Sequence, residues 1–246
     1  MMILPKMLSY PFLVRALIVG VLVSLYAALL GTSLVLKRYS MIRDGLSHVG
    51  FAALACAYPF GFSPLYISIP VCVAAAFFLL HLKESSRIKG DAATALMCSG
   101  ALAVGVMVIS LTTGMNTDVC NYLFGSILAM SSSDLYLSIV LSIAVLALYV
   151  LFFNRIFAVT FDETFAGATG VNVRLYNMVI AILTAVTVVL GMRMMGTLLI
   201  SSLIVFPSLT AMRVARKFKA TVILSAFLAV FFICFSIRRF HSRYCN

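Results

Sequence analysis

Long runs of apolar residues without a single charged side chain dominate the chain. Most of these runs match the roughly 20 residues, at about 1.5 Å of rise each, that a helix needs to cross a lipid bilayer. In chain order the uncharged runs are Ala16 to Leu36, Val49 to Leu80, Ala92 to Thr117, Leu135 to Phe153, Leu175 to Met192, Met194 to Met212 and Ala220 to Ile237. The pattern predicts a protein that crosses a membrane several times.

The second run is too long for one crossing and contains Pro59, Gly61, Pro64 and Pro70. Proline and glycine interrupt helices, so we expect two helices separated by a turn near "YPFGFSP", and about eight membrane segments in all. Lipid offers the backbone no hydrogen-bond partner, which leaves helices or closed barrels, and the uninterrupted runs favour helices. The predicted fold class is all-α, a polytopic transmembrane helical bundle.

Composition and charge agree with this prediction. Of the 246 residues, 63% are apolar and only 10% are charged, against about 25% charged in a typical soluble domain. The clusters "KRYSMIR", "KESSRIK" and "RVARKFK" fall on one side of the membrane, together with the connection from Asn154 to Arg174, if crossings alternate. The positive-inside rule makes that side cytoplasmic and puts the N-terminus outside. Membrane topology and attraction to anionic lipid account for the net charge of +11, so we expect no nucleic-acid partner.

The segment "TFDETFAGATGVNVR" interrupts the apolar pattern. Thr160 and Glu163 have the spacing of a capping box, and Asp162 and Glu163 lie where the positive end of a helix dipole favours carboxylates. Gly170 supplies the left-handed residue that commonly ends a helix. We therefore expect a short helix over residues 161–169, too short and too polar to cross the membrane.

Phe161 and Phe165, four residues apart, give this short helix one aromatic stripe. Two interpretations are open: a cytoplasmic helix that presents two phenylalanines and two carboxylates to a soluble partner, or an ordinary capped loop that packs on its own bundle. The chain contains no G-x-x-x-x-G-K-[ST] motif, so it does not bind nucleotide by a P-loop. If ATP drives the protein, the motor is another chain.

A second polar motif, "DGLSH", places Asp44 and His48 four residues apart, on one face of a helix, with Ser47 beside Asp44. A carboxylate and an imidazole on adjacent turns suit Zn²⁺, with Mn²⁺ and Fe²⁺ as alternatives. The competing interpretation is that Asp44 pairs with Arg43 or Lys37 and that His48 is a hydrogen-bonded core residue. Because polar pairs are costly in a membrane helix and mark sites there, we predict Asp44 and His48 as metal ligands, with Ser47 as a weaker candidate. The motif lacks the H-E-x-x-H pattern of zinc proteases, so no catalytic residue is expected.

Four segments carry a family resemblance: "GTSLVLKRYSMIRDGLSHVGFAALA", "NYLFGSILAMSSSDL", "FDETFAGATGVNVRLYN" and "MRMMGTLLISSLIVFPSLTAMRVAR". Together they resemble the permease subunit of the ABC importers that take up zinc, manganese or iron(II), with the bacterial high-affinity zinc permeases as the closest match. The resemblance runs in order from about Gly31 to Arg216.

The resemblance implies one transmembrane permease domain over residues 1–246, in the bacterial cytoplasmic membrane, that is not itself an enzyme and binds no covalent cofactor. It implies a homodimer of permeases, a cytoplasmic ABC ATPase that binds and hydrolyses ATP, and an extracellular solute-binding protein that delivers the ion. It makes the helix over 161–169 the coupling element and "DGLSH" the ion-pathway motif. Zinc is the favoured ion, with manganese or iron(II) as alternatives. A motor-independent transporter or channel is the other function class, which would show inverted repeats.

The C-terminal end departs from the family pattern. Such permeases continue after the segment that matches Ala220 to Ile237 into one more apolar helix, whereas this chain passes into "RRFHSRYCN". We therefore expect a truncated or frameshifted end after about residue 237.

Overall fold

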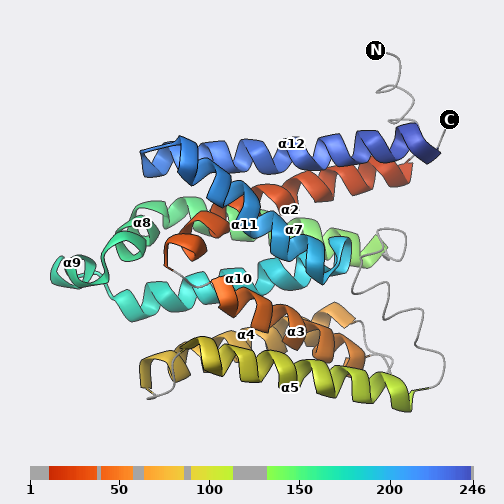
Figure 1. The fold of residues 1–246 in the computed structure, drawn as a ribbon, viewed down its shortest axis with the longest axis horizontal. Coiled ribbons are helices and arrows are strands. Elements are labelled where there is room, and N and C mark those ends of the chain that lie inside the picture. Colours follow the sequence, from red (N-terminus) through yellow and green to blue (C-terminus); the bar gives the residue numbers. More distant parts are fainter. Residues whose placement is uncertain (1–10, 38–39, 58–63, 86–89, 113–131, 245–246) are drawn as a thin grey trace.

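The computed structural model describes residues 11–37, 40–57, 64–85, 90–112 and 132–244. All regular structure in these ranges is helical (Figure 1), which confirms the all-α class. The helices are α2 (Pro11–Leu36), α3 (Ser40–Ala57), α4 (Pro64–Ser85), α5 (Gly90–Leu111), α7 (Ser132–Leu151), α8 (Phe153–Phe161), α9 (Glu163–Ala168), α10 (Val173–Met195), α11 (Thr197–Val214) and α12 (Phe218–Tyr244).

The long helices run side by side along the length of the molecule, with α12 and α5 at opposite edges (Figure 1). Helices α2 and α10 form the centre, since 67% of Leu17–Leu36 and 67% of Val173–Arg193 is buried. The corresponding share is 17% for Ala92–Leu111 in α5 and 28% for Phe218–Phe235 in α12. Because the peripheral helices are just as apolar, their exposed side chains suit contact with lipid or with another apolar surface.

The two ends of the bundle differ. The C-terminal end of α2, helices α8 and α9, and the connection from α11 to α12 lie at one end, whereas the start of α2 and the end of α12 lie at the other (Figure 1). Lys37, Arg155, Arg174 and Lys219 belong to the first of these ends. The described residues of three predicted basic connections therefore share one end of the molecule, whereas "KESSRIK" lies mostly outside the described residues.

Five of the described helices are long and apolar enough to cross a membrane individually, and a sixth span results if α7 and α8 count as one helix bent by 67°. Helix α11 has a shorter apolar stretch, Leu199–Val214, and α3 carries Arg43 and Asp44 near its start. Each of the predicted segments is thus helical in its described part, but the structure does not confirm eight full spans.

Three helix boundaries differ from the limits of the uncharged runs. Helix α3 begins at Ser40, before the uncharged run that starts at Val49, and so contains the whole motif "DGLSH", as the predicted helical spacing of Asp44 and His48 requires. The turn near "YPFGFSP" lies outside the described residues. Helices α10 and α11 are separated at Gly196, whose φ of 83° is a conformation that side-chain-bearing residues rarely adopt. Helix α12 continues past Ile237 to Tyr244.

The short polar helix is present, but its cap is not the predicted one. Asp162 is the N-cap of α9, and its carboxylate accepts hydrogen bonds from the backbone N–H groups of Thr164 and Phe165. Thr160 is buried and belongs to the preceding helix α8. The extended backbone of Asp162 ends α8 and starts α9 at the same residue, so an aspartate cap replaces the predicted capping box. Gly170, with a φ of 81°, follows α9 as predicted.

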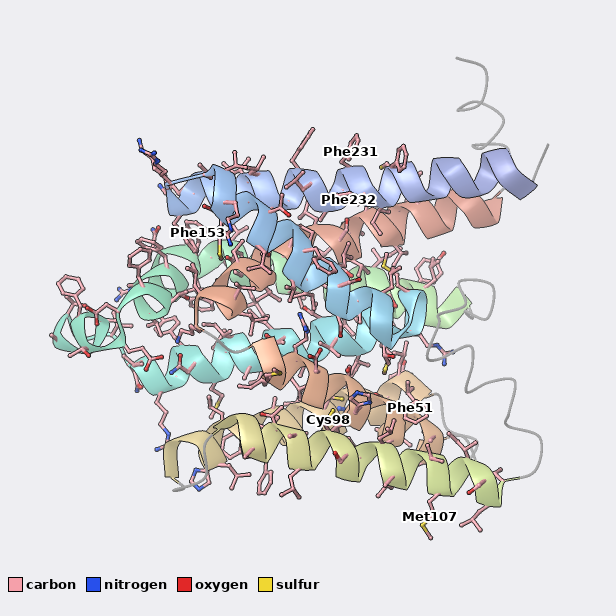
Figure 2. The ribbon with its side chains drawn as sticks, in the orientation of Figure 1. Phe51, Cys98, Met107, Phe153, Phe231 and Phe232 are labelled. Atoms are coloured by element: carbon pink, nitrogen blue, oxygen red, sulfur yellow. The ribbon has the colours of Figure 1, made fainter. Side chains whose placement is uncertain are left out.

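Glycines set the spacing between two pairs of helices. A Cβ atom on Gly31 of α2 would lie 2.1 Å from the carbonyl oxygen of Ile204 in α11. A Cβ atom on Gly105 of α5 would lie 2.7 Å from the ring of Phe51, which Figure 2 shows between α3 and α5. Gly100 has no neighbour within 4 Å of such an atom. The backbone of α2 can therefore approach α11 closely only because residue 31 has no side chain.

A Gly31→Ala substitution tests this close approach. The added methyl group meets a backbone carbonyl that cannot rotate away, and such overpacking costs about 1–3 kcal/mol of folding free energy. Gly167→Ala is the matched control, because a Cβ atom there would make only an ordinary contact, 3.8 Å from Val173, and we expect it to be neutral or to stabilise its helix by up to about 1 kcal/mol. Melting temperatures of the two purified variants in detergent measure the difference. Equal melting temperatures would show that the contact at Gly31 does not limit helix packing.

Candidate functional site

A pocket of about 700 Å³ lies between helices α3, α5 and α11. The residues around it are Met41, Arg43, Asp44, Gly45, Ser47, His48, Thr94, Ala95, Cys98, Thr197, Ser201, Ser202, Val205 and Phe206. The structure therefore brings the predicted Asp44, Ser47 and His48 to one cavity. It adds polar side chains from α5 and α11 that the motif "DGLSH" does not contain.

The carboxylate of Asp44 is held on one of its two oxygens. Oδ1 accepts hydrogen bonds from Arg43 Nε at 3.1 Å, from Arg43 Nη2 at 2.9 Å and from Ser201 Oγ at 3.1 Å. The Arg43 side chain is 8% exposed, whereas that of Asp44 is 40% exposed. The pairing with Arg43 that competed with a metal role is thus present, and it coexists with an opening of Asp44 to the pocket.

The positive charge of Arg43 offsets the negative charge of Asp44, so the pair is neutral before any ion arrives. A cation that binds Asp44 therefore competes with a fixed guanidinium only about 3 Å from the same carboxylate. Such competition favours weak binding and ready release, as transport requires.

His48 lies one helical turn beyond Asp44 and has an unsatisfied nitrogen. Its Nδ1 atom is buried, and among the described residues no group forms a hydrogen bond with it. An unpaired polar atom in a helical bundle costs free energy, which a ligand on that nitrogen would recover. The competing interpretation, in which His48 is a hydrogen-bonded core residue, is therefore not supported at this nitrogen.

Ser47 is also part of the pocket wall, but its side chain is already engaged. Ser47 Oγ donates to the backbone carbonyl of Asp44 at 2.8 Å, and the residue is 3% exposed. This local bond within α3 engages the hydroxyl hydrogen, and Ser47 stays the weaker candidate ligand.

Among the pocket residues that sequence reasoning missed, Ser201 and Cys98 lie close to Asp44. Figure 2 shows Cys98 of α5 beside α3, where its Sγ atom lies 4.0 Å from the backbone oxygen of Asp44. Neither residue shares a motif with Asp44, so only the folded packing reveals them. Within the described part of the chain, no group of three or more His, Cys, Asp and Glu residues is placed to hold a metal ion.

Two aromatic rings are exposed where α8 ends and α9 begins. Phe161 is 70% exposed and Phe165 is 64% exposed. Phe161 is the last residue of α8 and Phe165 lies in α9, so the predicted single helix over residues 161–169 is divided at Asp162 and the two rings do not share one helix. Helix α9 rests on a small apolar cluster formed by Ala166 with Val159 and Val171, and it exposes Phe165 on the side away from this cluster.

Glu163, in the first turn of α9, forms hydrogen bonds with two polar side chains of its own bundle. Its Oε1 atom accepts a hydrogen bond from Lys37 Nζ at 2.9 Å and one from Asn177 Nδ2 at 3.3 Å. Lys37 is almost fully buried, with 3% of its side chain exposed. Burial lowers the pKa of Lys37 below the usual lysine value, and the hydrogen bond and charge of Glu163 act in the opposite direction.

Comparisons with known proteins agree with this architecture. The model of the ABC 3 transport family matches residues 9–238. The manganese transport system membrane protein MntC of Listeria monocytogenes is 29% identical over 226 residues, which cover 92% of this chain and 80% of that protein. The manganese import system permease protein ScaB of Streptococcus gordonii is 31% identical over 220 residues, which cover 89% of this chain and 79% of that protein.

A relative named for zinc matches to a similar degree. The high-affinity zinc uptake system membrane protein ZnuB of Haemophilus influenzae is 28% identical, with 84% of this chain and 79% of that protein covered. Among solved structures, PsaBC from Streptococcus pneumoniae in complex with Fab superposes with a TM-score of 0.82 at 28% identity, covering 93% of this chain and 82% of that one. The predicted family is thus confirmed, while the relatives do not separate zinc from manganese. The chain belongs to the ABC 3 transport family and is a membrane permease of the metal-ion ABC importer type.

Proposed function

We propose that this permease carries a divalent metal ion, with zinc favoured, past Asp44 and His48 in the pocket between α3, α5 and α11. The observation that carries the proposal is the pairing of a carboxylate anchored on Oδ1 with a buried imidazole nitrogen that lacks a hydrogen-bond partner among the described residues. A carboxylate oxygen and an imidazole nitrogen are ordinary ligands of zinc.

The geometry of Asp44 supports this role. The three hydrogen bonds from Arg43 and Ser201 end on Oδ1, so Oδ2 is available to an ion that enters the pocket. Water or groups outside the described residues would complete the coordination shell. A transport site with few protein ligands binds its ion briefly, which is what translocation needs.

Manganese is the second candidate, and iron(II) a third. The relatives MntC and ScaB are named for manganese, and manganese also accepts carboxylate ligands. The imidazole of His48 and the thiol of Cys98 at the pocket wall are softer donors, which suit zinc better than manganese. Zinc is therefore the first ion to test.

The proposed complex contains three further components: a cytoplasmic ABC ATPase, an extracellular metal-binding protein and a second copy of the permease. The exposed Phe161 and Phe165 support ATPase docking at the α8–α9 end, which the basic connections make cytoplasmic. The open space around Gly100 on the mostly exposed α5 supports a closely packed second copy.

Substitutions at the two ligands test the metal site. Asp44→Asn removes the charge and His48→Ala removes the nitrogen, and each should lower zinc uptake by about tenfold or more, since even supporting residues of metal sites are worth 10–100-fold. His81→Ala, which removes an exposed histidine of α4, is the matched control. Uptake of zinc, manganese and iron(II) is measured separately in proteoliposomes that contain the whole importer, with permease insertion quantified. Wild-type uptake of all three ions by both variants would refute the ligand assignment, and faster manganese than zinc uptake by the unaltered protein would assign the site to manganese.

Replacing Phe161 and Phe165 together by alanine tests the docking surface. Both rings are mostly exposed, so the permease should keep its melting temperature. Its affinity for the ATPase should fall by about tenfold or more, because an aromatic anchor at an interface commonly contributes about 2 kcal/mol. Phe231→Ala on α12, where the ring is 54% exposed and points outward (Figure 2), is the control. Unchanged binding of the ATPase in both variants would remove α9 from the interface.

A further inference from the structure

Three polar side chains from distant parts of the chain meet beside α9. Lys37, which follows α2, donates hydrogen bonds from Nζ to Glu163 Oε1 and to Asn177 Oδ1. Asn177 of α10 donates from Nδ2 to the same oxygen of Glu163 at 3.3 Å. We call these three residues the Lys37 cluster. It joins the end of α2, the first turn of α9 and the first part of α10.

The Lys37 cluster is more than a surface ion pair. The Lys37 side chain is 3% exposed and Asn177 is 6% exposed, whereas Glu163 is about half exposed. A buried ammonium group is stable only with close hydrogen-bonded partners, and removal of one partner leaves an uncompensated charge. Exposed ion pairs, by contrast, contribute little and exchange freely with water. The cluster therefore holds α9 in one position relative to α2 and α10.

The position of the Lys37 cluster connects the two functional regions of the molecule. Glu163 lies in the first turn of α9, next to the exposed Phe165. On the other side, α3 begins at Ser40, shortly after Lys37, and carries Asp44 and His48. Helix α10, to which Asn177 belongs, packs against α2, α3, α4 and α11. A displacement of α9 would thus reach the helices around the pocket through the cluster.

We propose that the Lys37 cluster transmits the movement of α9 to the metal pathway, so that Lys37, Glu163 and Asn177 are positioning residues for transport. This inference rests on the proposed docking of the ATPase at α9. In the intact cluster, α9 and the end of α2 move as one body when the ATPase closes. Without the ionic contact, α9 follows the ATPase while α2 and α3 lag behind, and ATP is hydrolysed without metal movement.

The double variant Lys37→Met/Glu163→Gln separates this role from stability. Glu163→Gln alone would leave a buried ammonium without its carboxylate, whereas replacement of both charges in a buried pair is often neutral for stability. Lys219→Met, which removes an exposed lysine at the same end of the bundle, is the matched control. The charge-reversed pair Lys37→Glu/Glu163→Lys, compared with Lys37→Glu alone, tests whether the contact itself matters.

The experiment uses the complete importer in proteoliposomes and measures ATP hydrolysis, zinc uptake and equilibrium zinc binding. We expect the neutral double variant to bind the ATPase, hydrolyse ATP and bind zinc as the unaltered protein does, while zinc moved per ATP falls about fivefold or more, the lower end of usual coupling effects. Lys219→Met should keep the original ratio, and the charge-reversed pair should recover part of what Lys37→Glu loses.

An unchanged ratio of zinc to ATP in the neutral double variant would overturn the inference, as would an equal loss in the charge-reversed pair and in Lys37→Glu. If the substitutions of Phe161 and Phe165 leave ATPase binding intact, the docking proposal fails instead. If they abolish binding while the neutral double variant transports normally, docking stands and only the transmitting role of the Lys37 cluster is wrong.

Discussion

The ion pair between Arg43 and Asp44 decides how the candidate metal pocket is built. Charges within a helical bundle require close partners, because water is not available to solvate them. Arg43 binds one oxygen of Asp44 through two nitrogens, and Ser201 reaches the same oxygen from α11. The pair is therefore neutral and α3 is tied to α11. The remaining polar positions of the motif, the second oxygen of Asp44 and His48, are left to the cavity.

The need to pair a buried charge also shapes the Lys37 cluster beside α9. Lys37 is buried at the end of α2 and is stabilised by Glu163 and Asn177, which come from α9 and α10. In both places a cation of the N-terminal part of the chain is paired with a carboxylate, and a neutral polar side chain from a distant helix completes the group. Because each group joins elements that are remote in sequence, each is suited to respond when those elements shift against one another.

Local patterns in the sequence predicted the features that depend on helix geometry alone. Uncharged runs of membrane length located the helices, and the spacing of four residues placed Asp44 and His48 on one face and in one pocket. The packing of distant segments was not predictable in this way. Nothing in the sequence pairs Ser201 with Asp44 or Lys37 with Glu163.

Two neighbouring residues of similar capping ability explain why the predicted N-cap of the short polar helix was wrong. Thr160 and Asp162 can both cap a helix that contains Glu163, and only the buried position of Thr160 in α8 selects Asp162. The choice of metal belongs to the same class, because zinc and manganese share carboxylate and imidazole ligands.

The location of the bound ion tests the central claim most directly. A crystal of the zinc-loaded protein, with diffraction data collected on both sides of the zinc absorption edge, gives an anomalous peak at the metal. The account predicts that this peak lies in the pocket between α3, α5 and α11, at about 2.0–2.2 Å from an oxygen of Asp44 and a nitrogen of His48. A zinc peak elsewhere in the bundle, with Asp44 bound only to Arg43 and Ser201, would contradict it.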